Sequence, residues 1–218
     1  MDQNKRYDSF ARRLEDKSRY SLVKRCTDVL CSIALLILMS PLLILISLLI
    51  LWMDGMPIVF KQTRTGMNGE PFTIWKFRTM RQHNFEDEHQ YDWGTGVPNQ
   101  FVFKSSPGKH VTKLGMFLRK TSLDEIPQLV NVIRGDMSLI GPRPEIPAIT
   151  DLYNEEQSRR LDVKPGLTGF AQVHGRSDMT HGEKINYDLH YVERCCLLLD
   201  LSIIWKTIKL VISSKGSY

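Results

Sequence analysis

The sequence contains little cysteine, and its cysteines are not arranged as in common metal or redox motifs. There are four among 218 residues: Cys26, Cys31, Cys195 and Cys196. They form no CxxC pair, and two of them are adjacent, so neither a zinc site nor a disulfide framework is predicted. A reducing compartment such as the cytosol suits this composition.

Several other signatures are absent. We find no internal repeat, low-complexity tract, Walker loop or GxGxxG motif. The only long apolar run follows a charged leader and lacks a small-x-small exit, so a cleavable signal peptide is not expected. The formal charge of +5 and the pI near 9.0 are compatible with phosphorylated small molecules, anionic lipid or nucleic acid as partners. No nucleic acid partner is expected, because no recognition motif is present and most cations outside the leader are interleaved with acids.

A membrane segment is indicated near the N-terminus. Residues 1–28 form a cationic leader with eight Lys and Arg residues and five acids, whereas residues 29–53 contain no charge over 25 positions. As a straight helix this run would be ~37 Å long, enough to cross a hydrocarbon core of ~30 Å. The length alone therefore predicts a membrane helix.

The dipeptide Ser40-Pro41 interrupts this run in its middle. A proline inside a helix removes one backbone hydrogen bond and bends the helix, while Ser40 can bond back to the freed carbonyl. Each half is too short to cross alone. A re-entrant hairpin would put the leader and the Lys61/Arg64 side on the same cytosolic face, as the positive-inside bias favours. A kinked single span and a buried core hairpin are the alternatives.

The stretch of residues 119–129 combines acids, cations and a predicted helix start. Asp124 and Glu125 follow Arg119 and Lys120, and Ser122-x-x-Glu125 has the pattern of a capping box that would open a helix over residues 123–133. Free N–H groups at such a helix start and the nearby cations would attract a phosphate. The alternative is that the two acids only cap the helix and pair with Arg119.

Other segments complete the expected order of elements. A β-hairpin is predicted from residues 58–60 and 72–77 around a turn at residues 66–69, and a long surface loop or lid over residues 83–108. A rigid turn at residues 141–144 would hold Arg143, and a charged helix would follow at residues 146–160. The apolar stretch 197–212, with Asp200 as its N-cap, is predicted to form an amphipathic helix that lies in a membrane interface or packs on the core.

The order and spacing of these motifs resemble those of the bacterial sugar transferases, the monotopic phosphoglycosyl transferases that act on polyprenyl phosphate. The resemblance covers roughly residues 23–214 and includes Ser40-Pro41 and the segments 60–66, 76–80, 118–125, 127–129, 135–138, 141–144, 164–169 and 175–176. It implies an α/β (α+β) cytosolic catalytic domain over residues 54–218, with interfacial amphipathic helices and a re-entrant helix over residues 29–53. The implied location is the bacterial cytoplasmic membrane, where the domain contacts inner-membrane lipids.

The resemblance also implies a reaction: transfer of sugar-1-phosphate from a UDP-sugar to undecaprenyl phosphate, with Mg²⁺, at the start of lipid-linked polysaccharide assembly. By family analogy Asp124 is the nucleophile, Glu125 helps to hold the metal with Asp124 or manages a proton, and Arg119 positions the acids. The implied substrate-binding residues are Lys76, Arg78, Arg143, Gly166, Gly169, Gln172 and Arg176.

The chain departs from the family pattern at His174, where many relatives have Asn, and in the segment 178–182, which lacks a Trp. These departures leave the identity of the sugar open. The segment 178–191 resembles small family members that handle N-acetylated deoxy-amino sugars, and this resemblance favours a sugar of that class. Two alternative functions are a non-catalytic, membrane-anchored lipid-binding module and a nucleotide-sugar pyrophosphatase that uses water as the acceptor. A homodimer is also plausible.

Overall fold

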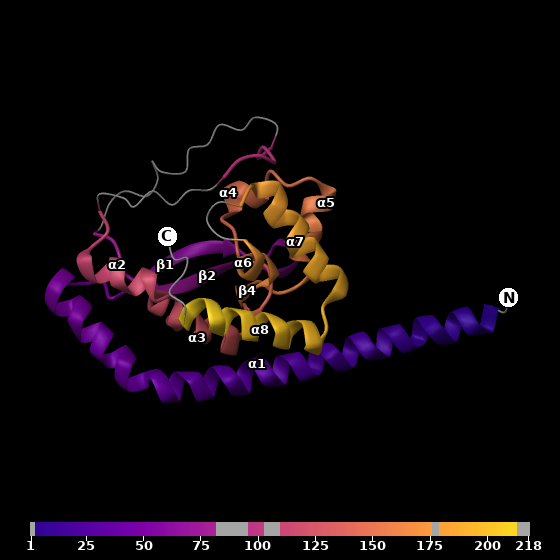
Figure 1. Ribbon diagram of the computed structural model, residues 1–218, viewed down its shortest axis with the longest axis horizontal. Helices are drawn as coiled ribbons and strands as arrows, with labels where there is room; N and C mark the ends of the chain where they lie inside the picture. Colours follow the sequence, from indigo (N-terminus) through magenta and orange to yellow (C-terminus); the bar gives the residue numbers. More distant parts are fainter. Residues whose placement is uncertain (1–2, 82–95, 103–109, 176–178, 213–218) are drawn as a thin grey trace.

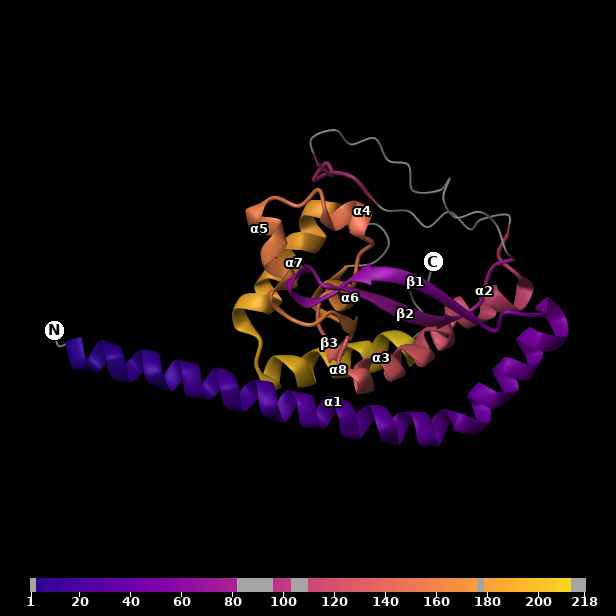
Figure 2. The same cartoon turned by 180° about the vertical axis from the view of Figure 1, so that it is seen from behind.

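The computed structural model describes residues 3–81, 96–102, 110–175 and 179–212, with side chains from residue 19 to residue 211. A long helix, α1 (Gln3–Asp54), lies along one face of a helix-rich α/β domain. In both views α1 passes beside α3 (Leu129–Arg134) and α8 (Leu197–Ile212) (Figures 1 and 2). Most of the predicted loop at residues 83–108 lies outside the described residues.

The interior proline of α1 is accommodated by the serine before it. Pro41 has no N–H to donate to the carbonyl of Ile37, and the Ser40 hydroxyl donates to that same oxygen at 2.8 Å. This confirms the predicted bond from Ser40 to the freed carbonyl. The helix stays continuous and bends along its course (Figure 1).

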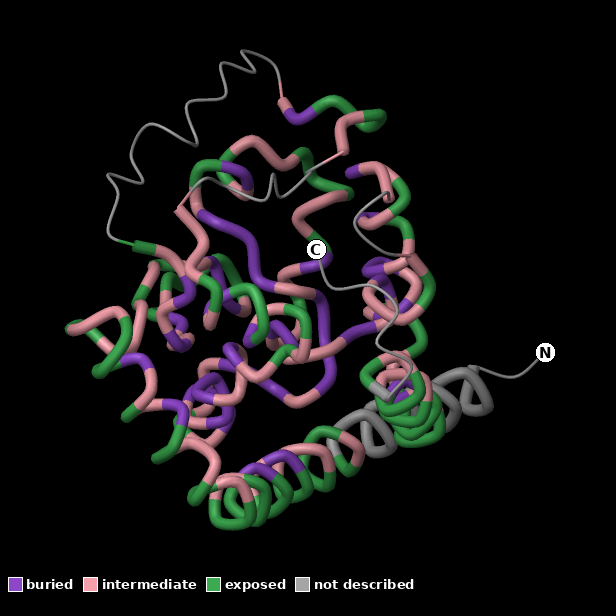
Figure 3. The backbone as a smooth tube through the Cα atoms, turned by 60° about the vertical axis from the view of Figure 1, so that its left-hand side comes forward, coloured by how far each residue is buried: buried purple, intermediate pink, exposed green. Residues whose placement is uncertain are grey.

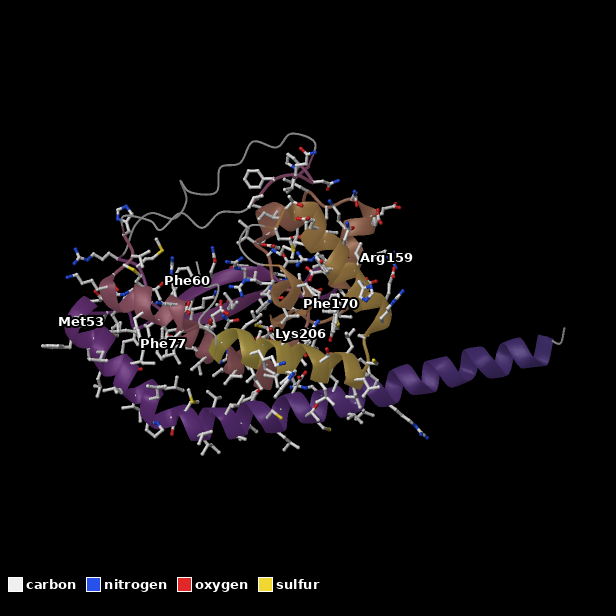
Figure 4. All side chains as sticks on the ribbon, in the orientation of Figure 1. Met53, Phe60, Phe77, Arg159, Phe170 and Lys206 are labelled. Atoms are coloured by element: carbon white, nitrogen blue, oxygen red, sulfur yellow. The ribbon has the colours of Figure 1, made fainter. Side chains whose placement is uncertain are left out.

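The C-terminal arm of α1 packs on the domain with one side only. Ile46 and Ile50 are buried against Phe77 and Leu118. The outward side is apolar and exposed (Figure 3), and the arm ends near Met53 (Figure 4). Within the described ranges, the part of α1 from Arg19 to Asp54 is the one helix that is long and apolar enough to cross a membrane.

The predicted hairpin is confirmed and slightly longer than expected. Strands β1 (Val59–Thr65) and β2 (Pro71–Phe77) pair antiparallel around a short 3-10 turn, η1 (Met67–Gly69). The inner face of β2 buries Ile74 against Val132 and Met137. The hairpin therefore rests on the segment that carries the carboxylate pair, because β2 contacts both η3 (Leu123–Gln128) and α3.

A second, two-stranded sheet stands beside this hairpin. Strands β3 (Ser138–Ile140) and β4 (Gly166–Thr168) pair in parallel. Two further helices, α6 (Phe170–His174) and α7 (His181–Arg194), follow β4 and lead to α8. Ile140, Tyr191 and Ile203 form the core between this sheet and helices α7 and α8.

The prediction of a single helix over residues 146–160 is wrong. The chain instead forms α4 (Pro147–Thr150), α5 (Glu155–Ser158) and the 3-10 turn η4 (Arg159–Asp162). The break arises because Asn154 caps α5: its side chain accepts from the N–H of Gln157, whose side chain bonds back to the N–H of Asn154. Helix α4 ends at Thr150, and the extended backbone of Asn154 prevents one helix from running through both segments.

The predicted helix at residues 197–212 is confirmed as α8, and it carries apolar side chains on both its buried and its exposed side. Leu198 and Trp205 are 79% and 60% exposed, while Ile203 is buried. The prediction that Asp200 is the N-cap is wrong, because α8 begins three residues earlier, at Leu197. Asp200 is buried in the first turn and accepts hydrogen bonds from the side chains of Tyr20, Lys24 and Tyr191, at 2.9, 2.9 and 2.8 Å. It ties α1 to α7 and α8.

Candidate active site

The carboxylate pair lies on a short 3-10 helix directly after a sharp turn. Helix α2 (Lys113–Lys120) ends before Ser122, whose backbone is left-handed with φ of 56°. The predicted capping box is wrong, since an N-cap residue has extended backbone and the Ser122 side chain caps nothing. The predicted helix over residues 123–133 is thus two elements, η3 and α3. Asp124 and Glu125 stand in the first turn of η3.

Glu125 is the centre of an ion-pair cluster. Its Oε1 accepts from Lys76 Nζ of β2 at 2.7 Å and from an Arg143 Nη at 2.5 Å, and its Oε2 accepts from the other Arg143 Nη at 3.3 Å. Burial alone would raise the pKa of Glu125, but the charges of Arg143 and Lys76 hold it well below its usual range. Glu125 is therefore a fixed anion that orients two cations.

Asp124 has the opposite environment from its neighbour. It is 8% exposed, and it accepts no hydrogen bond from any residue that the structure describes. Burial, reinforced by the charge of Glu125, raises the pKa of Asp124 to about 6, against the opposing charges of Lys76, Arg143 and Arg119. At neutral pH Asp124 is mostly ionised, unpaired and more basic than an ordinary carboxylate.

Arg64 is a third cation near this cluster, and it was not among the site residues predicted from the sequence. Arg64 on β1 donates to the carbonyl of Pro144 at 3.3 Å and to the side chain of Gln62 at 2.6 Å. Burial lowers its pKa, while the charges of Glu145 and Glu125 oppose that effect and Arg143 adds to it. The signal was present, since Arg64 stands in the segment 60–66 that carries part of the family resemblance.

The segment 141–145 is neither helix nor strand, as expected for its two prolines, and Arg143 reaches from it to Glu125. A backbone donor from the neighbouring strand β4 holds this segment close to the second sheet, since Gly166 N–H donates to Pro142 O at 2.8 Å. In return, Gly141 N–H donates to Thr168 O at 2.9 Å. Backbone hydrogen bonds at Gly141 and Pro142 thus attach the segment that carries Arg143 to strand β4.

The predicted substrate-binding glycines serve a close backbone approach. A Cβ on Gly166 would lie 2.1 Å from Gly141 N, and one on Gly169 would lie 2.2 Å from Gly141 O. Neither position has room for a side chain. The nearby amide of Gln172 is buried without a hydrogen-bond partner among the described residues. Contact of these residues with substrate stays a prediction, and Arg176 lies outside the described residues.

Two predicted arginines are held by groups other than the carboxylate pair. Arg119 Nε donates to Thr79 Oγ1 at 2.9 Å, and its charge opposes the rise in the pKa of Asp124 without a hydrogen bond to that residue. Arg78 donates to the backbone carbonyls of Asp54, Gly55 and Met56 at the C-terminus of α1. Arg78 joins the long helix to the domain, and its contact with substrate also stays a prediction.

The donors at this site fit a magnesium ion only in part. Mg²⁺ is commonly held by one or two carboxylates together with substrate phosphates. Asp124 has a carboxylate free for this purpose, whereas both oxygens of Glu125 are engaged by cations. The described residues contain no group of three His, Cys, Asp or Glu side chains that could hold a metal by themselves. The phosphates of a substrate would have to supply most of the remaining ligands.

Fold and site together define a domain joined to a long apolar helix, with an unpaired carboxylate set among cations suited to phosphate. The model of one family, described as "Bacterial sugar transferase", matches residues 19–214, and the chain belongs to this family. It is 41% identical over 209 residues to the exopolysaccharide production protein ExoY of Sinorhizobium fredii, a match that covers 89% of this chain and 88% of that protein.

Two longer relatives have names that state a reaction. The undecaprenyl-phosphate galactose phosphotransferase of Salmonella typhimurium is 38% identical over 205 residues. The UDP-glucose:undecaprenyl-phosphate glucose-1-phosphate transferase of Escherichia coli is 37% identical over 205 residues. Each match covers 90% of this chain but 42% of the relative, so the chain corresponds to less than half of each of these proteins.

Proposed function

We propose that this protein is a phosphoglycosyl transferase that transfers a sugar-1-phosphate from a UDP-sugar to undecaprenyl phosphate and releases UMP. The observation that carries the proposal is the buried, unpaired carboxylate of Asp124 beside the Glu125 cluster with Lys76 and Arg143. The names of the relatives support the reaction class. The product would begin a lipid-linked polysaccharide such as an exopolysaccharide or capsule.

In the first step a carboxylate oxygen of Asp124 attacks the phosphorus that is bonded to the sugar oxygen. A bond forms between Asp124 and phosphorus, the bond from phosphorus to the UMP oxygen breaks, and UMP leaves with the electron pair. The raised pKa of Asp124 favours this attack, because the group is ionised at pH 7 and more nucleophilic than an ordinary carboxylate. Lys76, Arg143 and Arg64 would neutralise the charge on the phosphate oxygens.

In the second step a phosphate oxygen of undecaprenyl phosphate attacks the same phosphorus. The bond to Asp124 breaks and the carboxylate is restored, leaving undecaprenyl diphosphate linked to the sugar. Each displacement brings one anionic substrate to the site, so the two never have to be held there together. If Mg²⁺ is bound by Asp124 and the diphosphate, it supplies further neutralisation of negative charge.

We infer that α1 enters the bacterial cytoplasmic membrane and returns, with the domain on the cytosolic face. The support is the bend of α1, the bond from Ser40 that keeps Pro41 tolerable in lipid, and the cationic leader. The exposed apolar side chains of α8 would lie at the same membrane surface. A phosphate on a lipid in that leaflet would then reach the domain without leaving the interface.

The test is UMP release by detergent-purified protein with Mg²⁺, undecaprenyl phosphate and a panel of UDP-sugars. The wild-type protein is expected to release UMP with one UDP-sugar of the panel. Asp124→Asn is expected to lower the rate of UMP release at least about 10³-fold, since it removes the nucleophile. Asp151→Asn is the matched control, because Asp151 is an exposed acid at the end of α4.

The alternatives give different outcomes in this assay. A lipid-binding module would bind anionic liposomes and release no UMP from any sugar of the panel. A nucleotide-sugar pyrophosphatase would turn over without the lipid. Full activity of the Asp124→Asn protein would refute the assignment of the nucleophile. The homodimer stays a prediction, which the mass of the detergent-solubilised particle would test.

A further inference from the structure

The segment 141–145, which bears Arg143, is fixed by hydrogen bonds from other parts of the chain. Two of its residues are prolines, which have no N–H, so the segment depends on donors from other elements to fix its carbonyls. Those donors come from distant parts of the chain. Arg64 Nη donates to Pro144 O at 3.3 Å, Thr65 N–H donates to Glu145 O at 2.9 Å, and Arg160 Nη donates to Arg143 O at 2.9 Å.

The donor to Arg143 is itself the centre of a buried network. Arg160 is 2% exposed, and the Nη atom that donates to Arg143 O also donates to Asp188 Oδ2 at 2.6 Å. Its other Nη donates to Tyr153 OH at 2.5 Å and lies 3.8 Å from Glu145 Oε1. One planar guanidinium thus connects η4, α7 and the segment that bears Arg143.

The geometry of this network requires an arginine. A lysine ammonium is a single point on a flexible stem and cannot reproduce a planar fork that reaches Arg143 O, Asp188 and Tyr153 OH at once. Stability alone does not account for the pair, since buried ion pairs are often no more stabilising than apolar replacements of similar volume. What the pair does fix is the backbone from which Arg143 reaches Glu125.

We propose that Arg160, held by Asp188 and Tyr153, is a positioning residue that sets the Arg143 guanidinium against Glu125. The effect on Asp124 is indirect: a displaced Arg143 would leave Glu125 and the substrate phosphate with one cation fewer at the right distance. This inference rests on the proposed reaction for its kinetic consequences. It does not need that reaction for its structural consequence, the orientation of Arg143.

The kinetic test is a double-mutant cycle. Arg160→Lys is expected to lower kcat/KM about 10²-fold, as for a misplacement of roughly 1 Å at a reacting group. In an Arg143→Ala background the same change is expected to lower it less than about 3-fold, because the group it positions is already absent. Equal losses in both backgrounds would show that Arg160 acts through general stability, and would overturn the proposal.

The matched control is Arg159→Lys. Arg159 is the neighbouring residue and forms a half-exposed pair with Glu193 at the edge of the domain (Figure 4), so no change is expected. If Arg160→Lys fails to fold, Tyr153→Phe tests the same point, since it removes one hydrogen bond to Arg160 and leaves the ion pair with Asp188. It is expected to give a smaller loss that is again absent in the Arg143→Ala background.

A spectroscopic measurement separates this inference from the proposed reaction. In ¹⁵N-arginine-labelled protein, the side-chain signal of Arg143, assigned by its loss in Arg143→Lys, is expected to shift in Arg160→Lys and Tyr153→Phe and to stay in place in Arg159→Lys. A signal unmoved in all three variants would overturn the positioning role even if the enzyme turns over. A shifted signal in a protein without turnover would leave the positioning role standing and count against the reaction.

Discussion

Replacing the proposed nucleophile is expected to make the folded protein more stable. Asp124 is buried, and its folded-state pKa is about 6 against 3.8 for an ordinary Asp. A difference of about 2 pKa units corresponds to about 3 kcal/mol, and the 8% exposure of Asp124 leaves little solvent screening to discount. Asp124→Asn keeps the shape of the side chain and removes its ionisation, so it should raise the free energy of unfolding at pH 7.5 by about 3 kcal/mol.

The stability difference between Asp124→Asn and wild type is expected to depend on pH. The folded state holds the Asp124 proton more tightly than the unfolded state, so the stability from this group is complete below pH 4 and is lost as the pH rises through 6. The Asp124→Asn variant has no carboxyl group at this position, so it does not undergo this loss of stability. The difference in the free energy of unfolding between Asp124→Asn and wild type should therefore be near zero at pH 4. It should grow between pH 4 and 6 and stay constant at higher pH.

The assay is thermal unfolding of both proteins in detergent with EDTA, from pH 4 to pH 8 at one scan rate. For a chain of this size a gain of about 3 kcal/mol corresponds to a rise in Tm of about 6–12 °C. Asp151→Asn serves as the control, with no expected trend in pH. The reasoning would be refuted if Asp124→Asn were less stable than wild type at pH 7.5, or if the difference in Tm between the two proteins did not change with pH.

Three further predictions concern the cluster, the helix joint and the membrane segment. Glu125→Gln removes a charge that raises the pKa of Asp124, so the acid limb of the kcat/KM profile should move to lower pH; an unmoved limb would mean that Asp124 is not the titrating group. Asp200→Asn weakens the ion pair that holds Lys24, so trypsin should cleave at Lys24 faster than in wild type, and an unchanged rate would show that the pair does not hold α1. Pro41→Ala should straighten α1 enough to span the bilayer, moving an N-terminal tag to the outer face; if the tag stays protected from external protease, the bend does not set the topology.

Some features could be predicted from the sequence because local chemistry determines them. The bond from Ser40 to a carbonyl freed by Pro41 follows from what a proline lacks and from what a serine can donate. The hairpin follows from two strand-like runs around a glycine-bearing turn, and helix α8 follows from an apolar run that has polar residues at helical spacing. In each case the deciding residues are neighbours in the chain.

Other features could not be predicted because the backbone or distant residues decide them. Ser122-x-x-Glu125 matches a capping box in sequence, yet the chain must turn sharply after α2, and Ser122 takes up a left-handed backbone instead. Asp200 lies at a helix start by pattern, but Tyr20 and Lys24, far away in the sequence, draw it into a buried network. Such roles depend on tertiary contacts that periodicity does not record.

The division of roles between Asp124 and Glu125 shows why this limit matters at the site. The two residues are adjacent and chemically alike, and the sequence alone favours neither as the more basic. The fold separates them by giving both cations to Glu125, through Lys76 from β2 and Arg143 from the segment after β3. Glu125 thereby becomes a permanent anion, and burial, reinforced by the charge of Glu125, raises the pKa of Asp124. A pair of carboxylates with pKa values pushed apart in this way can divide the work, one as reactant and one as anchor for the cations.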